Sequence, residues 1–123
     1  MSSKSPAQDD FRGRLSRYRE IKITVTGRKS SKPISNPVWF VVEVDKLYLL
    51  PVTGSDTQWY KNVKKNPSIR VDARGAESTL KATPVTDATQ VKSVVEKFRE
   101  KYGAGDVKKY YSKFDIAVVL TLQ

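Results

Sequence analysis

Residues 38–50 read Val-Trp-Phe-Val-Val-Glu-Val-Asp-Lys-Leu-Tyr-Leu-Leu, two β-rich runs on either side of a short, mostly polar segment. Unbroken apolar runs of this length are typical of strands that are covered on both faces. Residues 38–42 and 47–50 are therefore predicted to form a hairpin in a barrel or sandwich core. Pro37 and Pro51 bracket the hairpin, and because proline cannot donate to a central ladder, each should mark a strand end, a bulge or an edge.

Further strands are predicted on both sides of this hairpin. Apolar and polar residues alternate at 21–26, and Gly27 ends that run. The same alternation at 69–73 and 79–83 predicts a second hairpin around Gly75, and residues 116–120 form a last apolar run. The chain should therefore contain six short strands.

Helices are predicted between these strands. A capping box of Ser55 and Gln58 predicts a short helix that stops before Asn66-Pro67, and a 3.6-residue period predicts a helix from Asp87 to Gly103. Residues 9–19 fit a short basic helix that docks through Phe11, Leu15 and Tyr18, whereas residues 101–111 fit a mobile lid or an amphipathic connector. The expected fold is α+β, mainly β: a small antiparallel barrel of six strands with outer helices.

A chain of 123 residues has room for one domain, so residues 1–8 are interpreted as a flexible N-terminus and residues 9–123 as a single domain. The sequence has no cysteine and no histidine. This excludes disulfides, thiolate nucleophiles and His-based acid–base catalysis, and no metal site is predicted. Because no apolar stretch reaches the length of a membrane span or a signal peptide, a soluble, cytoplasmic protein is expected.

The charge is concentrated near the N-terminus. Lys and Arg total 23 against 13 Asp and Glu, which gives a net charge of +10, and residues 1–32 carry nine bases against three acids, or +6. Net charge governs steering and binding, not fold. Nucleic acid, anionic lipid and an anionic small molecule are all open as partners on this ground alone.

The segment Thr26-Gly27-Arg28-Lys29-Ser30-Ser31-Lys32 is the densest cluster of binding groups. A glycine ends a strand, three cations follow within five residues, and two hydroxyls lie between them. Glycine lets backbone N–H groups turn toward a ligand, arginine forks onto phosphate or carboxylate, and lysine adds a mobile point charge. The pattern predicts an anion-binding loop, although short basic loops are often simply solvated.

Several motifs in order resemble the deazaflavin (F420)-dependent nitroreductase family, split β-barrel proteins related to flavin reductases and pyridoxamine phosphate oxidases. The matching segments are Thr26–Ser30, Asn36–Phe40, Asp45–Val52, Gly54–Asp56, Trp59–Val63 and Asn66-Pro67. The resemblance implies the split barrel of the FMN-binding type. It also implies transfer of a hydride from reduced F420 to an electron-poor small molecule such as a quinone, an enone or a nitroaromatic.

The resemblance also implies roles for individual residues. The residues that match cofactor-binding positions are Arg28, Lys29 and Ser30 for the phosphate and tail, Pro37 and Trp39 beside the ring, Leu50, Pro51, Val52 and Thr53 beneath it, and Gln58 and Trp59 over it. Tyr102, Tyr110 and Tyr111 are candidates for the substrate wall. No catalytic residue is nominated, because a cofactor that carries the reactive group needs binding and orientation from the protein. A homodimer is possible by resemblance.

Alternatives stay open at this point. The chain has Ser31, Ile34 and Thr53 where the family often has Gly, Arg and, in one branch, Lys. Two cations are therefore missing from the expected site, so FMN is the competing cofactor, and a cofactor-free relative of the split barrels also stays open. A basic module that binds nucleic acid is a further alternative from a different functional class.

Overall fold

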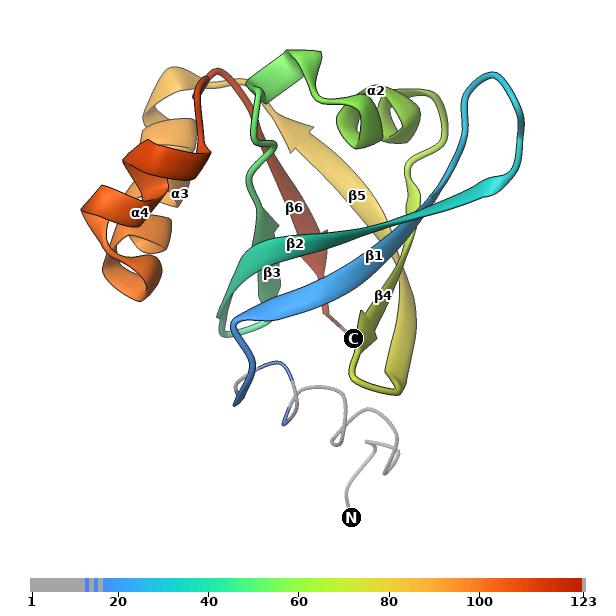
Figure 1. The fold of residues 1–123 in the computed structure, drawn as a ribbon, viewed down its shortest axis with the longest axis horizontal. Helices are drawn as coiled ribbons and strands as arrows, with labels where there is room; N and C mark the ends of the chain where they lie inside the picture. The colour runs from blue at the N-terminus through green and yellow to red at the C-terminus, as the bar shows by residue number, and fades with distance from the viewer. Residues whose placement is uncertain (1–12, 14, 16, 123) are drawn as a thin grey trace.

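The computed structural model describes residues 13, 15 and 17–122, and these form a closed antiparallel barrel in the strand order β1-β2-β3-β6-β5-β4 (Figure 1). The predicted six-stranded barrel with outer helices is confirmed. The elements are β1 (Glu20–Thr26), β2 (Pro33–Glu43), β3 (Lys46–Leu49), η1 (Gly54–Asp56), α2 (Gln58–Lys65), β4 (Ser68–Ala73), β5 (Ala76–Val85), α3 (Ala88–Tyr102), α4 (Ala104–Tyr110) and β6 (Ala117–Thr121).

Strand β2 is shared between the two halves of the barrel. Its first part, residues 33–39, pairs with β1, and its second part, residues 40–43, pairs with β3. Pro37 lies inside β2 opposite Lys22, so it does not end a strand, but the described strands pair with this stretch on one side only. The expectation of an edge is therefore confirmed at Pro37, and that of a strand end at Pro51, which follows β3.

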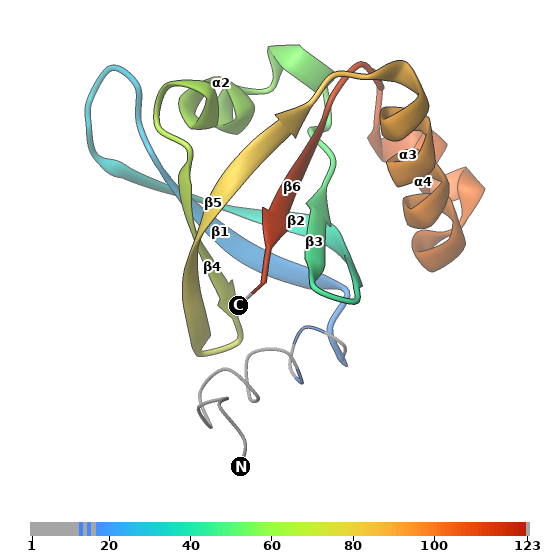
Figure 2. The same cartoon turned by 180° about the vertical axis from the view of Figure 1, so that it is seen from behind.

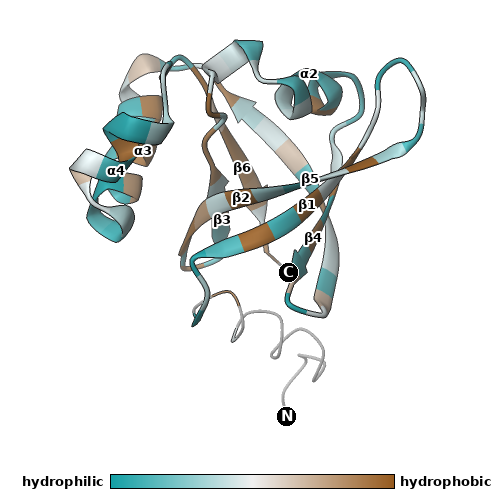
Figure 3. Ribbon diagram, viewed as in Figure 1, coloured by the Kyte–Doolittle hydropathy of each residue, from teal (hydrophilic) through white to brown (hydrophobic). Residues whose placement is uncertain are grey.

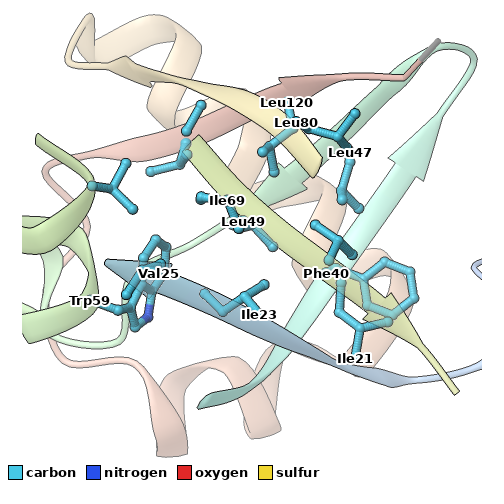
Figure 4. Packing of buried hydrophobic residues seen from close by; sticks show 14 of the residues in the cluster. Ile21, Ile23, Val25, Phe40, Leu47, Leu49, Trp59, Ile69, Leu80 and Leu120 are labelled. Atoms are coloured by element: carbon cyan, nitrogen blue, oxygen red, sulfur yellow. The ribbon is translucent and has the colours of Figure 1, made fainter. Parts of the chain in front are cut away.

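The barrel interior is filled by the inward-facing residues of all six strands (Figure 4). In β1, Ile21, Ile23 and Val25 are almost fully buried while Lys22 faces out, as the alternation predicts. Coloured by hydropathy, the barrel strands carry most of the brown bands and the surface loops are teal (Figure 3). Apolar burial on this scale is the main source of the stability of such a domain.

A second apolar cluster covers the outside of the barrel. Helices α3 and α4 lie against the face of β2 and β3 (Figures 1 and 2), and Phe98, Tyr102 and Val107 of the helices pack with Val41 and Leu50. The β2–β3 hairpin is thus buried on one face by the barrel core and on the other by helices. This explains why its strands lack the polar alternation of β1 and β4.

Helix α3 begins and ends where the sequence predicts. Asp87 accepts a hydrogen bond from the Gln90 amide, and Gly103 follows the last residue with a φ of 95°. The capping box is wrong, however: Ser55 lies in η1 and bonds to Asp115, and the N-cap of α2 is Thr57. Helix α2 still ends before Asn66-Pro67.

Residues 104–110 form helix α4, which buries Val107 and exposes Lys108 and Lys109, so the amphipathic connector is a helix. Glycines at 103 and 105 interrupt the helical pattern in the sequence and conceal this helix. Most of the predicted helix at 9–19 lies outside the described residues; of its docking face, Leu15 is buried, and Phe11 is not described. Over the described part of the chain, the helices are too short or too polar to cross a bilayer.

Candidate functional site

Two adjoining hollows form a cleft along β2. They lie beside the first part of this strand, residues 33–39, on the edge that does not pair with β1. The first has a volume of about 420 Å³ and is lined by the β1–β2 loop and α2. The second, of about 500 Å³, is lined by β2, the chain after β3 and the end of α4. Asn36, Thr57 and Trp59 line both hollows, so the two form one continuous site.

Arg28 is the best-anchored cation of the first hollow. Its Nη1 donates to Asn62 Oδ1 at 2.8 Å and its Nη2 to Gln58 Oε1 at 2.9 Å, and the backbone N–H of Arg28 donates to the same Asn62 oxygen at 3.1 Å. The Lys65 ammonium donates to the Arg28 carbonyl at 3.1 Å. Helix α2 therefore holds both the backbone and the side chain of this loop residue.

The rest of the β1–β2 loop is closed by its own hydrogen bonds. Gly27 N donates to Lys32 O at 2.8 Å, and Ser31 N donates to Gly27 O at 2.9 Å. Ser31 has a φ of 60°, which lies in the left-handed region that favours glycine. Lys29 and Ser30 line the hollow from this loop, and both are exposed.

Asn62 is a site residue that the sequence analysis missed. It is 4% exposed on the inner face of α2 and lines the first hollow. Because Arg28 can only donate, the atom facing it must be the amide oxygen, and the Asn62 amide nitrogen then meets no acceptor among the described residues. A polar residue on the otherwise apolar face of a short helix was the signal that could have found it.

The second hollow is aromatic and largely apolar. Trp39 stacks on Tyr102 with ring centroids 4.2 Å apart and an interplanar angle of 6°, and Tyr110 meets Trp39 edge-on at 5.4 Å. Trp39, Leu50 and Tyr111 form its inner wall, while Val52 and Tyr110 are 44% and 51% exposed at its mouth. A flat molecule with one apolar face suits such a wall.

The two tryptophans both line the cleft, but they come from different parts of the fold. Trp59, expected to close over a ligand, is 6% exposed and packs into the barrel core beside Val25, with one side toward the cleft (Figure 4). Trp39, expected beside the ring, lies outside the barrel against the helices. The alternation within β2 decides this, because Phe40 points inward and its neighbours point outward.

The structure brings most of the predicted site residues together. Those that line the cleft are Arg28, Lys29, Ser30, Pro37, Trp39, Leu50, Val52, Gln58, Trp59, Tyr110 and Tyr111. Pro51, Thr53 and Tyr102 do not line either hollow. Thr53 instead bonds Thr57 through its amide and its hydroxyl, each at 2.9 Å, and so holds the turn that leads into α2.

The two buried phenols stay protonated near neutral pH. Burial raises the pKa of Tyr102 to about 12, and burial followed by the neighbouring Tyr102 raises that of Tyr111 well above its ordinary value. The Tyr102 hydroxyl is occupied by backbone groups of β2 and of Arg19. Tyr110 is the one phenol of the three that reaches solvent at the cleft.

The donor set fits a flat, anionic cofactor. Cations lie at one end of the cleft, and aromatic and aliphatic side chains lie at the other. Phosphate and carboxylate groups require the first kind of surface and a fused ring system the second. Fold and cleft together define a split-barrel protein of the class that binds a flavin or a deazaflavin.

Residues 7–123 match the model of the F420H2-dependent quinone reductase family, and the chain belongs to that family. The protein is therefore an oxidoreductase, its cofactor is coenzyme F420, and its reaction is the F420H2-dependent reduction of quinones. Membership favours F420 over FMN despite Ile34 and Thr53.

Solved structures share the fold. An F420H2-dependent reductase, FDR-A, superposes with a TM-score of 0.64 at 21% identity, over 83% of this chain and 93% of that one. A domain-swapped dimer gives 0.66 at 21% identity over 94% and 99% of the two chains. A protein from Listeria innocua assigned as a pyridoxamine 5'-phosphate oxidase gives 0.67 at 14% identity over 93% and 91%. This chain therefore shares the split-barrel fold with proteins that have little sequence in common with it.

Proposed function

We propose that the cleft beside β2 is where F420H2 binds, with its phosphate and acidic tail in the first hollow and its ring in the second. The observation that carries this is the continuity of the two hollows through Asn36, Thr57 and Trp59. Arg28 and Lys29 hold the anionic part, and Trp39 and Leu50 support the ring.

When bound, the reduced deazaflavin supplies a hydride, and no protein nucleophile is needed. The residues of the chain bind, orient and limit water. Trp39 is fixed by its stack on Tyr102, so the wall of the second hollow is rigid before any ligand arrives. Val52 and Tyr110 lie at the open mouth, which gives the acceptor access to the ring and lets solvent supply the proton that completes a quinol.

The mouth of the cleft also sets the range of acceptors. It offers exposed aromatic and aliphatic surface, and its phenol at Tyr110 can hydrogen-bond a carbonyl or nitro oxygen. Enones and nitroaromatics share with quinones a flat, electron-poor core and such oxygens, so we extend the proposal to them. A homodimer belongs to the same proposal, supported by the fold shared with a domain-swapped dimer.

Titration of the protein with F420, followed by tryptophan fluorescence, tests the proposal. We expect quenching at micromolar cofactor, because two tryptophans line the cleft. Arg28→Ala and Lys29→Ala should each weaken binding by about 10- to 100-fold, the worth of a hydrogen bond to a charged group. Lys32→Ala is the matched control: it removes the same charge from the same loop, but Lys32 does not line the hollow.

The outcome that would overturn the proposal is an absence of quenching up to about millimolar F420, or equal effects of all three substitutions. FMN and a single-stranded oligonucleotide, titrated in parallel, measure selectivity. Tighter binding of either than of F420 would reassign the cleft.

A further inference from the structure

The guanidinium of Arg28 is held by two neutral amides. Asn62 and Gln58 accept from its two terminal nitrogens at 2.8 and 2.9 Å, and no carboxylate of the described residues forms an ion pair with it. Arginines at protein surfaces commonly pair with Asp or Glu, and here amides take that place. The two amide oxygens hold the guanidinium at two points, as a carboxylate would, but they bring no negative charge.

The two segments that surround the first hollow contain no acidic residue. Residues 27–35 carry Arg28, Lys29 and Lys32, and residues 57–68 carry Lys61, Lys64 and Lys65. A carboxylate at position 58 or 62 would hold Arg28 as firmly but would cancel much of its attraction for an anion, since the Coulomb energy depends on net local charge. The amides therefore separate two tasks, fixing the side chain and preserving its charge.

Asn62 carries more of this task than Gln58. Its side-chain oxygen receives both the guanidinium and the backbone N–H of Arg28, so one atom fixes the rotamer and the loop together. It is 4% exposed, whereas Gln58 is exposed. A buried amide with this contact is costly to leave unpaired, and it is rigid because the helix around it is packed.

From these contacts we infer that Asn62 is a positioning residue that aims Arg28 into the first hollow and, by being neutral, keeps the full charge of Arg28 available to an anionic ligand. This inference rests on the proposed function, in which that ligand is the acidic part of F420. The inference adds a requirement on position 62 that cofactor binding alone does not impose. The residue at position 62 must accept hydrogen bonds, and it must carry no charge.

Two substitutions separate the two requirements. Asn62→Ala removes the acceptor, and Asn62→Asp keeps an acceptor of the same shape and adds a charge. Asn66→Asp is the matched control, because Asn66 ends the same helix and has no hydrogen bond to Arg28. The dissociation constant for F420 and the melting temperature without ligand are measured for each variant.

We expect Asn62→Ala to weaken F420 binding about 10-fold and Asn62→Asp about 100-fold, while Asn66→Asp stays within about 2-fold. The two variants should rank differently in melting temperature than in F420 affinity. Asn62→Asp should melt at or above the temperature of Asn62→Ala, because its new carboxylate forms an ion pair with Arg28 in place of the amide contact. A residue with a purely structural role would give the same order in both measurements. That result would overturn the inference.

A double-mutant cycle tests whether Asn62 acts through Arg28. In an Arg28→Ala background, Asn62→Ala should change F420 affinity by less than about 2-fold. If the two substitutions are additive, Asn62 acts through the loop backbone or on the ligand and not through the Arg28 side chain. The inference then fails, although the proposed function stands.

A measurement without ligand keeps the inference independent of cofactor binding. Restricted rotation of the Arg28 guanidinium, seen as separate side-chain nitrogen signals by NMR at low temperature, should be present in the wild type and absent in Asn62→Ala. If the wild type shows free rotation, Asn62 does not position Arg28. If rotation is restricted but F420 does not bind, the proposed function fails and the positioning contact remains.

Discussion

The Tyr102 hydroxyl accepts a hydrogen bond from the Phe40 amide at 3.0 Å and lies 2.9 Å from the carbonyl oxygen of the same residue. Phe40 is the first residue of β2 that pairs with β3, directly after the stretch that pairs with β1. Strand β2 changes its pairing partner from β1 to β3 at this point. The Tyr102 side chain, at the end of α3, hydrogen-bonds the backbone of β2 there. The Trp39 ring stacked on Tyr102 is held in place by the same contact.

Tyr102→Phe should lower the free energy of unfolding by about 1–3 kcal/mol, because it leaves the buried amide of Phe40 without its partner. Chemical denaturation measures this. Tyr110→Phe is the control, since Tyr110 is 51% exposed and should stay within about 0.5 kcal/mol. Equal stabilities of the two variants would show that the β2 transition does not depend on Tyr102.

Lys101 makes stability depend on pH in the alkaline range. Burial, and then repulsion from Arg19, lowers the pKa of Lys101 from 10.5 to about 8. Between these two values the unfolded chain binds more protons than the folded one, so stability rises with pH from about 8 toward 10. The ammonium keeps contact with solvent, and the rise should be on the order of 1 kcal/mol. Tyr102, with its pKa raised to about 12, opposes it above pH 10.

Unfolding curves at intervals of half a pH unit detect this rise, and Lys101→Met should abolish it between pH 8 and 10. The ammonium donates to the Phe40 carbonyl at 2.8 Å and lies 3.6 Å from the centre of the Phe40 ring, so the methionine should keep the apolar packing. A rise of the same size in Lys101→Met would assign the effect to another group.

Gly54→Ala should destabilise the protein by about 2 kcal/mol or more. Gly54 has a φ of 57°, and a Cβ there would overlap the Asp115 carboxylate, which accepts from Ser55 N at 2.9 Å. Gly105→Ala is the matched comparison: Gly105 lies in α4 with no atom near its missing Cβ, so the change should stabilise by about 0.5–1 kcal/mol. Thermal unfolding of both variants shows whether each substitution lowers or raises stability. A lower stability of Gly105→Ala would contradict this account of α4.

Tyr110→Ala should raise KM for a hydrophobic quinone several-fold and leave the dissociation constant of F420 unchanged within about 2-fold. The ring lies at the mouth of the second hollow, far along the cleft from the loop of Arg28. Lys109→Ala controls for a general effect on α4, since Lys109 does not line the cleft. Steady-state kinetics measure KM for the quinone, and fluorescence titration measures the dissociation constant of F420. A parallel loss of F420 affinity would show that Tyr110 contacts the cofactor.

Sequence periodicity was sufficient for the barrel. The alternation of β1 and β4 indicates strands buried on one face, and the unbroken apolar runs of β2 and β3 indicate strands buried on both faces. It also located α3, whose apolar stripe runs without interruption from its cap to Gly103. It failed at α4, where two glycines break the pattern, and at Ser55, whose hydroxyl has a partner in Asp115 that is 60 residues away. Such a long-range hydrogen bond overrides a local capping signal.

The candidate site was only partly open to prediction. The basic loop after β1 and the family motifs pointed to Arg28 and Lys29, but Asn62 enters through a contact across 34 residues of sequence. The position of Trp39 outside the barrel follows from which face of β2 points into the barrel, and that depends on the register with β1.

The sequence by itself determined the six strands, the long helix, the basic loop and the family, because local periodicity and ordered motifs are properties of the chain. Only the tertiary structure decided that β2 leaves an unpaired edge and that two hollows meet beside it. It also decided that Arg28 is held by amides and not by carboxylates. Those features arise from packing between segments far apart in the chain, where the partner of each polar group is chosen by the fold.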